Sequence, residues 1–274
     1  MDSSDNIYVT GQIQYGGLDG NSTSGGSDIF LVKYNSSGVK QWTRQLGTSS
    51  NDYGYGVTVD SSDNIYVTGK TQGGLDGNSS SGNMDIVLIK YNSSGTKQWT
   101  RQLGTSSDEE GSGVAVDSSN NIYVTGYTSG GLDGNSNSGG WPKDIFLVKY
   151  NSSGTKQWTR QLGTTSNDLG YGVIVDSSNN IYVTGDAGGG LDGNTSSGNH
   201  DIFLVKYNSS GVKQWTRQLG TSDWDQGNGV TVDSLGDIYV TGYTNDEFDG
   251  NTNVGVVGSA DIFLVKYNAS GVKQ

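Results

Sequence analysis

Acidic and amide residues recur at a fixed spacing in this sequence, and their oxygen atoms are the first candidates for chemistry. The string Gly-Leu-Asp-Gly-Asn is followed by a further aspartate in sets of one pattern: Asp19, Asn21 and Asp28; Asp76, Asn78 and Asp85; and Asp192, Asn194 and Asp201. Ca²⁺ takes about six to eight oxygen ligands, so each set is a candidate calcium site. The alternative is an Asx-turn without metal, because the spacing differs from that of an EF-hand loop and two other copies insert residues before Asp144 and Asp261.

A second group of acidic residues lies at one repeated position, two residues before a glycine: Asp52, Glu109, Asp168 and Asp225. If these positions recur around a ring, their carboxylates concentrate negative potential at one rim and attract cations or basic partners. The alternative is a solvated loop in which each carboxylate caps backbone N–H groups.

Aromatic residues supply the third set of candidates. Trp141 and Trp224 each occur in one copy only and lie in loops, so we expect them to offer exposed contacts to a protein or glycan ligand. Four other tryptophans recur in register and are either sugar-stacking platforms or packing residues between neighbouring copies: Trp42, Trp99, Trp158 and Trp215. His200 is the only histidine, and because other copies replace it with Ser27, Met84, Lys143 or Ala260, a loop position is favoured over a general base.

Composition and charge exclude several classes of protein. The net charge of −12 disfavours binding to nucleic acid or to anionic membranes. No apolar run approaches the ~18 residues of a membrane span, and the polar residues after Met1 do not form a signal peptide. The absence of cysteine excludes disulfides and thiolate metal sites, so calcium is the only cofactor that the sequence suggests.

These candidates are positioned by an internal repeat of about 58 residues, whose copies begin near residues 2, 60, 117, 176 and 233. Each copy contains four strand-like runs, which in the second copy are 56–59, 64–68, 85–91 and 97–103. The runs are rich in Val, Ile, Tyr and Thr and are bounded by Gly, Asn, Asp and Ser, as strands are. No segment of ten residues shows a helical period, so the pattern predicts an all-β protein.

The third run of each copy is apolar on both faces, with Ile29 and Leu31 on one side and Phe30 and Val32 on the other. Both faces must therefore be covered. Four antiparallel strands per copy, covered by neighbouring copies, describe the blade of a β-propeller. We therefore expect residues 1–274 to form one five-bladed propeller domain, in which the first copy lacks an inner strand and the last lacks an outer strand. A longer array of blades is the alternative, and a β-solenoid is disfavoured because its rungs need only about 20–30 residues.

Two strings resemble the signature of bacterial SBBP-type β-propeller repeats: Gly-Val-Thr-Val-Asp-Ser-Ser-Asp-Asn-Ile-Tyr-Val-Thr-Gly at 56–69, and Asp-Ile-Phe-Leu-Val-Lys-Tyr-Asn-Ser-Ser-Gly at 28–38. The resemblance covers the whole chain. It implies that Gly-Val-Thr-Val forms the innermost strand and Trp-Thr-Arg-Gln-Leu the outermost. It also implies an extracellular or cell-surface location and no general enzymatic activity.

The sequence therefore favours a non-enzymatic scaffold for interaction or adhesion, which binds a protein or a glycan. One alternative is an enzyme that acts on polysaccharide with loop carboxylates as acid and base. A second alternative is a structural component that self-associates through its incomplete terminal blades, since unpaired strand edges invite pairing with another chain.

Overall fold

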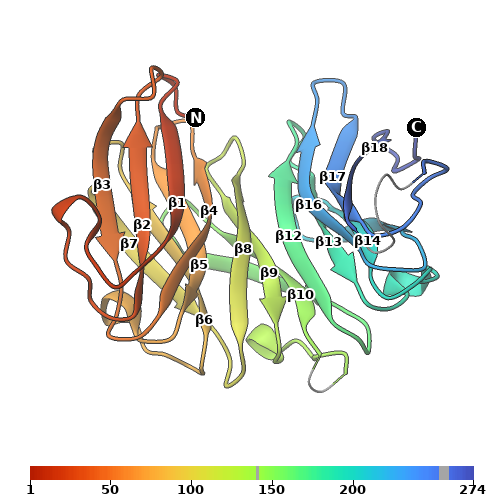
Figure 1. Ribbon diagram of the computed structural model, residues 1–274, viewed down its shortest axis with the longest axis horizontal. Coiled ribbons are helices and arrows are strands. Elements are labelled where there is room, and N and C mark those ends of the chain that lie inside the picture. The colour runs from red at the N-terminus through yellow and green to blue at the C-terminus, as the bar shows by residue number, and fades with distance from the viewer. Residues whose placement is uncertain (140–141, 253–258) are drawn as a thin grey trace.

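Strands and tight turns build the whole described part of the chain (Figure 1). The computed structural model describes residues 1–139, 142–252 and 259–274. This part holds 18 strands in five antiparallel sheets, so the predicted all-β class and the five blades are confirmed. No helix in these residues is long and apolar enough to cross a membrane.

Three of the five sheets have four strands, which follow one another from the inner to the outer position. The second sheet comprises β4 (Asp52–Val59), β5 (Ile65–Thr71), β6 (Asp85–Tyr91) and β7 (Lys97–Leu103). The third comprises β8 (Glu109–Val116), β9 (Ile122–Thr128), β10 (Asp144–Tyr150) and β11 (Lys156–Leu162). The fourth comprises β12 (Asp168–Val175), β13 (Ile181–Ala187), β14 (Asp201–Tyr207) and β15 (Lys213–Leu219).

The first and fifth sheets have three strands each. The first comprises β1 (Ile7–Gln14), β2 (Ser27–Tyr34) and β3 (Lys40–Leu46) and has no strand in the inner position. The fifth comprises β16 (Asp225–Val232), β17 (Ile238–Thr244) and β18 (Asp261–Tyr267) and has no strand in the outer position. The repeated sequence predicted both of these gaps.

The hairpin between the inner and second strands is held by one aspartate in each copy. In the second copy the Asp60 carboxylate accepts the backbone N–H groups of Ser62 and Asn64, both at 2.9 Å. The hydroxyl of Tyr66 donates to the same carboxylate at 2.9 Å, and Asp63 takes the left-handed conformation that the turn requires. The string Asp-Ser-Ser-Asp-Asn therefore specifies the turn through a side chain that replaces backbone partners.

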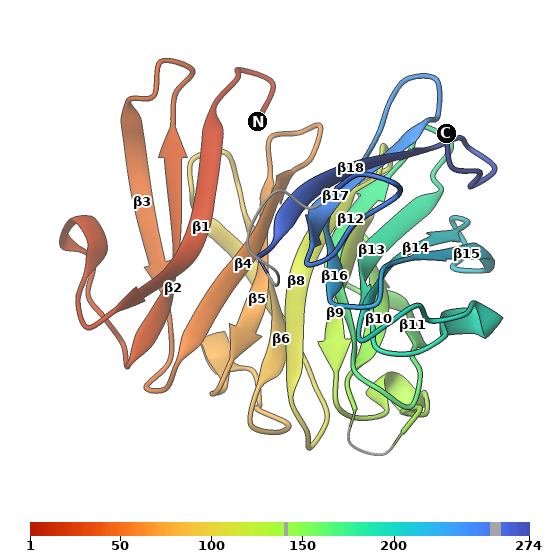
Figure 2. The ribbon, with the colours of Figure 1, turned by 45° about the vertical axis from the view of Figure 1, so that its right-hand side comes forward.

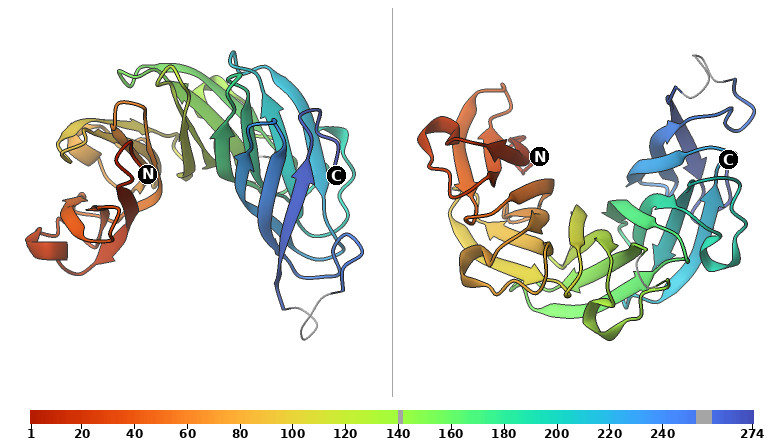
Figure 3. Two further views of the ribbon diagram at one scale, coloured as in Figure 1. Left: turned by 90° about the horizontal axis from the view of Figure 1, so that it is seen from above. Right: turned by 60° about the horizontal axis from the view of Figure 1, so that its bottom comes forward.

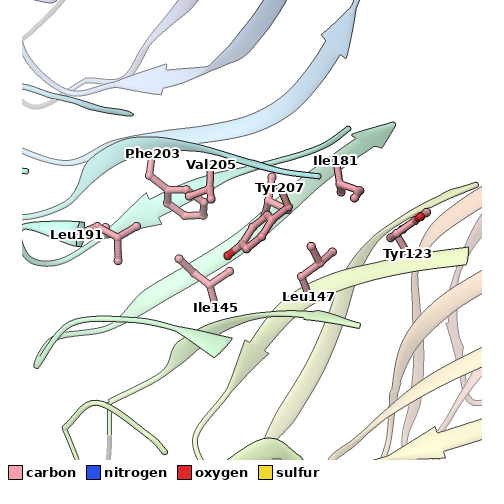
Figure 4. Close-up of a cluster of buried hydrophobic side chains, with 10 residues drawn as sticks. Tyr123, Ile145, Leu147, Ile181, Leu191, Phe203, Val205 and Tyr207 are labelled. Atoms are coloured by element: carbon pink, nitrogen blue, oxygen red, sulfur yellow. The ribbon is translucent and has the colours of Figure 1, made fainter. Parts of the chain in front are cut away.

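The hydrophobic core lies in the four seams between successive sheets. Figure 4 shows the seam between the third and fourth sheets, where Ile145 and Leu147 of β10 face Ile181, Val205 and Tyr207 of the fourth sheet. The opposite side chains of β10, Phe146 and Val148, enter the seam with the second sheet. Both faces of β10 are buried, as its apolar pattern predicted. The equivalent strand of the fifth sheet, β18, departs from the prediction, because Ile262 and Leu264 on one of its faces are exposed.

The outer strands fasten each sheet to the next one. The Arg44 guanidinium lies over the Trp42 ring, 4.9 Å from its centroid, and donates from Nε to the Gly95 carbonyl of the second sheet at 2.7 Å. The Trp42 ring also lies 6.1 Å from that of Tyr8. The tryptophans that recur in the outer strands are therefore packing residues of the seams, which was one of the two roles predicted for them.

The five sheets stack along an open arc, with the first and fifth sheets at its two ends (Figure 3). The inner strands β4, β8, β12 and β16 pack against one another in this order along the concave side (Figures 2 and 3). In the described residues the apolar side chains that would close a ring stay exposed, with Ile7 and Val9 on the first sheet and Ile262 and Leu264 on the fifth. The expected ring of blades is thus not closed by this chain alone.

Candidate functional site

Each residue of the predicted calcium sites has at least one protein hydrogen-bond partner, although one carboxylate oxygen of Asp28, Asp85 and Asp201 has none. The Asp19 carboxylate accepts hydrogen bonds from Lys40 and Thr43, and the Asn21 amide donates to the Leu18 carbonyl at 2.6 Å. Asp28 is buried and accepts from the Gln45 amide at 2.8 Å. The same contacts recur around Asp76, Asn78 and Asp85 and around Asp192, Asn194 and Asp201.

The loops that carry these residues are turns with a defined structural role. Asp19, Asp76 and Asp192 adopt left-handed backbone conformations inside short 3₁₀ turns. Across residues 1–139, 142–252 and 259–274, no three acidic or histidine side chains group as metal ligands would. The described residues therefore do not assemble the candidate calcium sites. The turns also differ from the Asx-turn alternative, because Asp19, Asp76 and Asp192 accept hydrogen bonds from lysine and threonine side chains of the outer strand.

The second acidic group lies in the interior and not at a solvent-facing rim. Asp52, Glu109, Asp168 and Asp225 are fully buried at the first positions of the inner strands. The Asp52 carboxylate accepts the Thr48 N–H at 2.6 Å and the hydroxyl of Thr71. Burial raises the pKa of all four carboxyls, that of Asp168 to about 6. The prediction of an exposed acidic rim is wrong, because each carboxylate caps a backbone amide inside a seam.

Trp224 is the predicted ligand contact that the structure places in a distinctive setting; Trp141 lies outside the described residues. The Trp224 side chain is 37% exposed and stacks on the His200 ring, with centroids 3.9 Å apart and planes within 7°. His200 is buried beneath it and hydrogen bonds through Nδ1 to the buried Asp186 carboxylate. Backbone pairing fixes the stack, since the Asp225 N–H donates to the His200 carbonyl at 2.8 Å.

The sequence did not indicate a role for Asp186, nor did it predict that His200 contacts Asp186 and Trp224. Asp186 lies on β13 at a position that Lys70, Tyr127 and Tyr243 occupy in other copies. Burial, followed by the charge of Asp186, raises the pKa of Tyr171 on the adjacent inner strand. The available signal was the difference between copies, because His200, Trp224 and Asp186 are each unique at repeated positions.

Other residues that differ between copies also contact one another along the concave side. Lys70 pairs with Glu110 of the next sheet at 2.7 Å and lies over the rings of Tyr53 and Tyr55. The two tyrosine rings stack with centroids 6.3 Å apart. Residues that differ between copies thus contact one another across this seam, whereas residues common to the copies form the hydrophobic core of the seams.

A cavity of about 740 Å³ lies beside the Trp224–His200 stack. Its lining combines the two rings with amide and hydroxyl side chains: Trp224, His200, Asn199, Asn167, Ser166 and Thr165. None of its described lining residues carries a carboxylate. Flat rings with neighbouring amides and hydroxyls can bind a ligand that has both an apolar face and polar edges.

Stacked sheets of near-identical sequence, whose inner strands line a common concave surface, define a β-propeller repeat protein. The family described as SBBP, a beta-propeller repeat, matches this sequence at residues 41–76, 98–133, 157–192 and 214–249, which together make up more than half of the chain. The chain belongs to this family.

A curated relative is the "Regulatory protein FlaEY" of Caulobacter vibrioides, which is 27% identical over 259 residues. The match covers 83% of this chain but only 27% of the relative, so the chain spans about a quarter of that protein's length.

Two solved structures share the fold. A protein of unknown function from Bacteroides caccae aligns with a TM-score of 0.53 and 9% identity over 90% of this chain and 78% of its own. A polysaccharide lyase, an ulvan lyase bound to sugar, aligns with a TM-score of 0.52 and 12% identity over 100% of this chain and 67% of its own. At these identities the likeness concerns the fold alone.

Proposed function

We propose that this chain is a non-enzymatic interaction scaffold that binds a glycan at the Trp224 site, defined as Trp224, His200, Asp186 and the cavity beside them. The stack of Trp224 on His200 carries the proposal. The Trp224 ring stacks on His200 and lines the open hollow beside it, and no other copy has a tryptophan at this position. We also propose the extracellular or cell-surface location that the family resemblance implies.

A sugar fits the chemistry of this site. Pyranose rings present an apolar face of C–H groups, which packs on an aromatic ring, and a rim of hydroxyls, which pairs with amides and hydroxyls. Asn167, Asn199 and Ser166 supply such groups beside the Trp224 ring. The rigid seams hold these partners in place before the ligand arrives, which reduces the entropy lost on binding.

An enzymatic role receives less support from the arrangement of carboxylates. Glycoside hydrolysis normally uses two carboxyl groups that face one substrate. Asp52 and its equivalents are buried and accept hydrogen bonds from the protein. The described cavity lining brings no carboxylate toward a ligand.

A glycan array probed with the whole chain, followed by calorimetry on the bound glycans, tests the proposal. We expect Trp224→Ala to weaken binding by about tenfold or more, as loss of a central aromatic anchor does. Trp224→Phe should show an intermediate loss, because a smaller ring keeps part of the stacking surface.

Leu235→Ala provides the matched control. Leu235 is exposed on the turn that follows β16, at the opposite end of this strand from Trp224, so its loss should leave affinity unchanged. The proposal is wrong if the array shows no glycan binding, or if Trp224→Ala binds as tightly as the wild type.

A further inference from the structure

The four internal seams define what each face of a sheet binds. Toward the next sheet, every internal third strand presents an isoleucine and a leucine that are at most 3% exposed, such as Ile202 and Leu204. Toward the preceding sheet, every internal second strand presents buried residues such as Ile65 and Val67. One kind of face therefore always packs against the other.

The fifth sheet presents the first kind of face without a partner in the described chain. Ile262 and Leu264 of β18 are 92% and 71% exposed, although they occupy the positions of Ile202 and Leu204. Thr241 of β17 is exposed as well, whereas its counterpart Thr184 is buried. We call Thr241, Ile262 and Leu264 the leading face.

The first sheet presents the second kind of face, also uncovered. Ile7 and Val9 of β1 are 39% and 43% exposed, and their counterparts Ile65 and Val67 are fully buried. We call Ile7, Val9 and their neighbour Phe30 the trailing face. The first and fifth sheets lie at opposite ends of the arc (Figure 3), so within the described residues the trailing face of one molecule does not cover its own leading face.

We propose that the leading face of one molecule binds the trailing face of a second copy, so that the chain associates head to tail. The residues on the two faces are those that already pack together at four internal seams, which supplies the geometry of the new contact. Because the two faces differ, the interface is heterologous, and growth continues until a ring closes or a filament forms.

The intermolecular seam is smaller than an internal seam. Internal seams also contain inner-strand residues such as Val57 and Val59 and outer-strand residues such as Trp42 and Leu46. The first sheet has no inner strand and the fifth has no outer strand, so the contact between copies lacks these contributions. We therefore expect reversible association that depends on protein concentration.

Sedimentation of the full chain over a wide concentration range tests the proposal. The wild type should form dimers and larger species as its concentration rises. Ile262→Asp disables the leading face and Val9→Asp disables the trailing face, so each variant alone should stay monomeric, with a dissociation constant raised more than tenfold. An equimolar mixture of the two should form dimers that grow no further, because one intact face of each kind is left.

This mixture distinguishes head-to-tail association from other contacts. Association of Val9→Asp with itself would show leading faces that pair symmetrically, and a wild type that is monomeric at every concentration would show no contact at all; either result overturns the proposal. Ile262 is exposed, so circular dichroism and thermal unfolding of its variant in dilute solution should match the wild type. Leu264→Asp is a second variant of the same face if Ile262→Asp fails to fold.

Discussion

The seams between sheets and the Trp224 site are built from opposite kinds of sequence. The seams use residues that every copy repeats, and they are buried and apolar, as Ile145 and Leu147 show. The Trp224 site uses residues that no other copy has at the equivalent position, and it joins a partly exposed ring to a buried carboxylate. The repeated residues therefore build the packed sheets, and the residues that differ between copies form the Trp224 site.

The largest expected effect compares one leucine at an internal seam with its exposed equivalent. Leu147→Ala removes a buried side chain from the third seam and should lower the free energy of unfolding by about 2–5 kcal/mol. Leu264→Ala changes the same repeated position where it is 71% exposed, so a loss below about 0.5 kcal/mol is expected. Urea unfolding in dilute solution measures both. Equal losses would show that burial in the seams does not set the energetics.

The buried carboxylates of the seams predict a dependence of stability on pH. Because burial raises the pKa of Asp168 to about 6, the folded state binds protons more tightly than the unfolded state. The free energy of unfolding should therefore fall as the pH rises from about 4 to above 6, by about 1–3 kcal/mol for this group. Asp52, Glu109 and Asp225 shift in the same direction and should add to the slope.

Asp168→Asn removes one of these titrating groups and should flatten the slope between pH 4 and pH 8. Urea unfolding across this range measures it, and the slope is the readout because the amide also changes the local hydrogen bonds. Leu147→Ala provides the control, because it lowers the stability without removing an ionisable group and should leave the slope nearly unchanged. An unaltered slope in Asp168→Asn would contradict the role assigned to burial.

The fold was predictable because each copy repeats the same pattern of strands and turns. Apolar residues on both sides of the third strand required covered faces, and β10 indeed fills two seams. The burial of Asp52 was not predictable from its neighbours in sequence. Its partner Thr71 and the sheet that covers it approach only after the strands pair.

The Trp224 site was predictable only in part. Trp224 stood out because it is unique and borne on a loop, but its contact with His200 crosses from the fourth sheet to the fifth. Free exchange of His200 between copies predicts a loop residue. Exchange between copies shows that the sheets can pack without a particular residue at that position. It does not show that the residue lacks a specific partner in its own copy.

A smaller effect on stability is expected at the contact between His200 and Asp186. His200→Ala leaves the Asp186 carboxylate buried without its ring partner, so the free energy of unfolding should fall by about 1–3 kcal/mol. Met84→Ala alters the equivalent, half-buried position of the second copy and should cost less. The double variant His200→Ala with Asp186→Asn should recover part of the loss, since a neutral amide is less costly to bury than a charge. If the double variant recovers no stability, the unpartnered Asp186 carboxylate is not the cause of the loss in His200→Ala.

The smallest effect concerns a repeated contact that lies at the surface. A lysine of the outer strand pairs with the aspartate of the 3₁₀ turn in several copies, as Lys156 does with Asp133, and both side chains are partly exposed. Solvent and salt screen such pairs, so Lys156→Met should change the free energy of unfolding by less than about 0.5 kcal/mol in urea unfolding. Thr159→Val is the companion variant, because its hydroxyl binds the same carboxylate from a buried position and its loss should cost more. A larger loss from Lys156→Met than from Thr159→Val would contradict this expectation. It would show that burial does not decide which of the repeated contacts stabilise the fold.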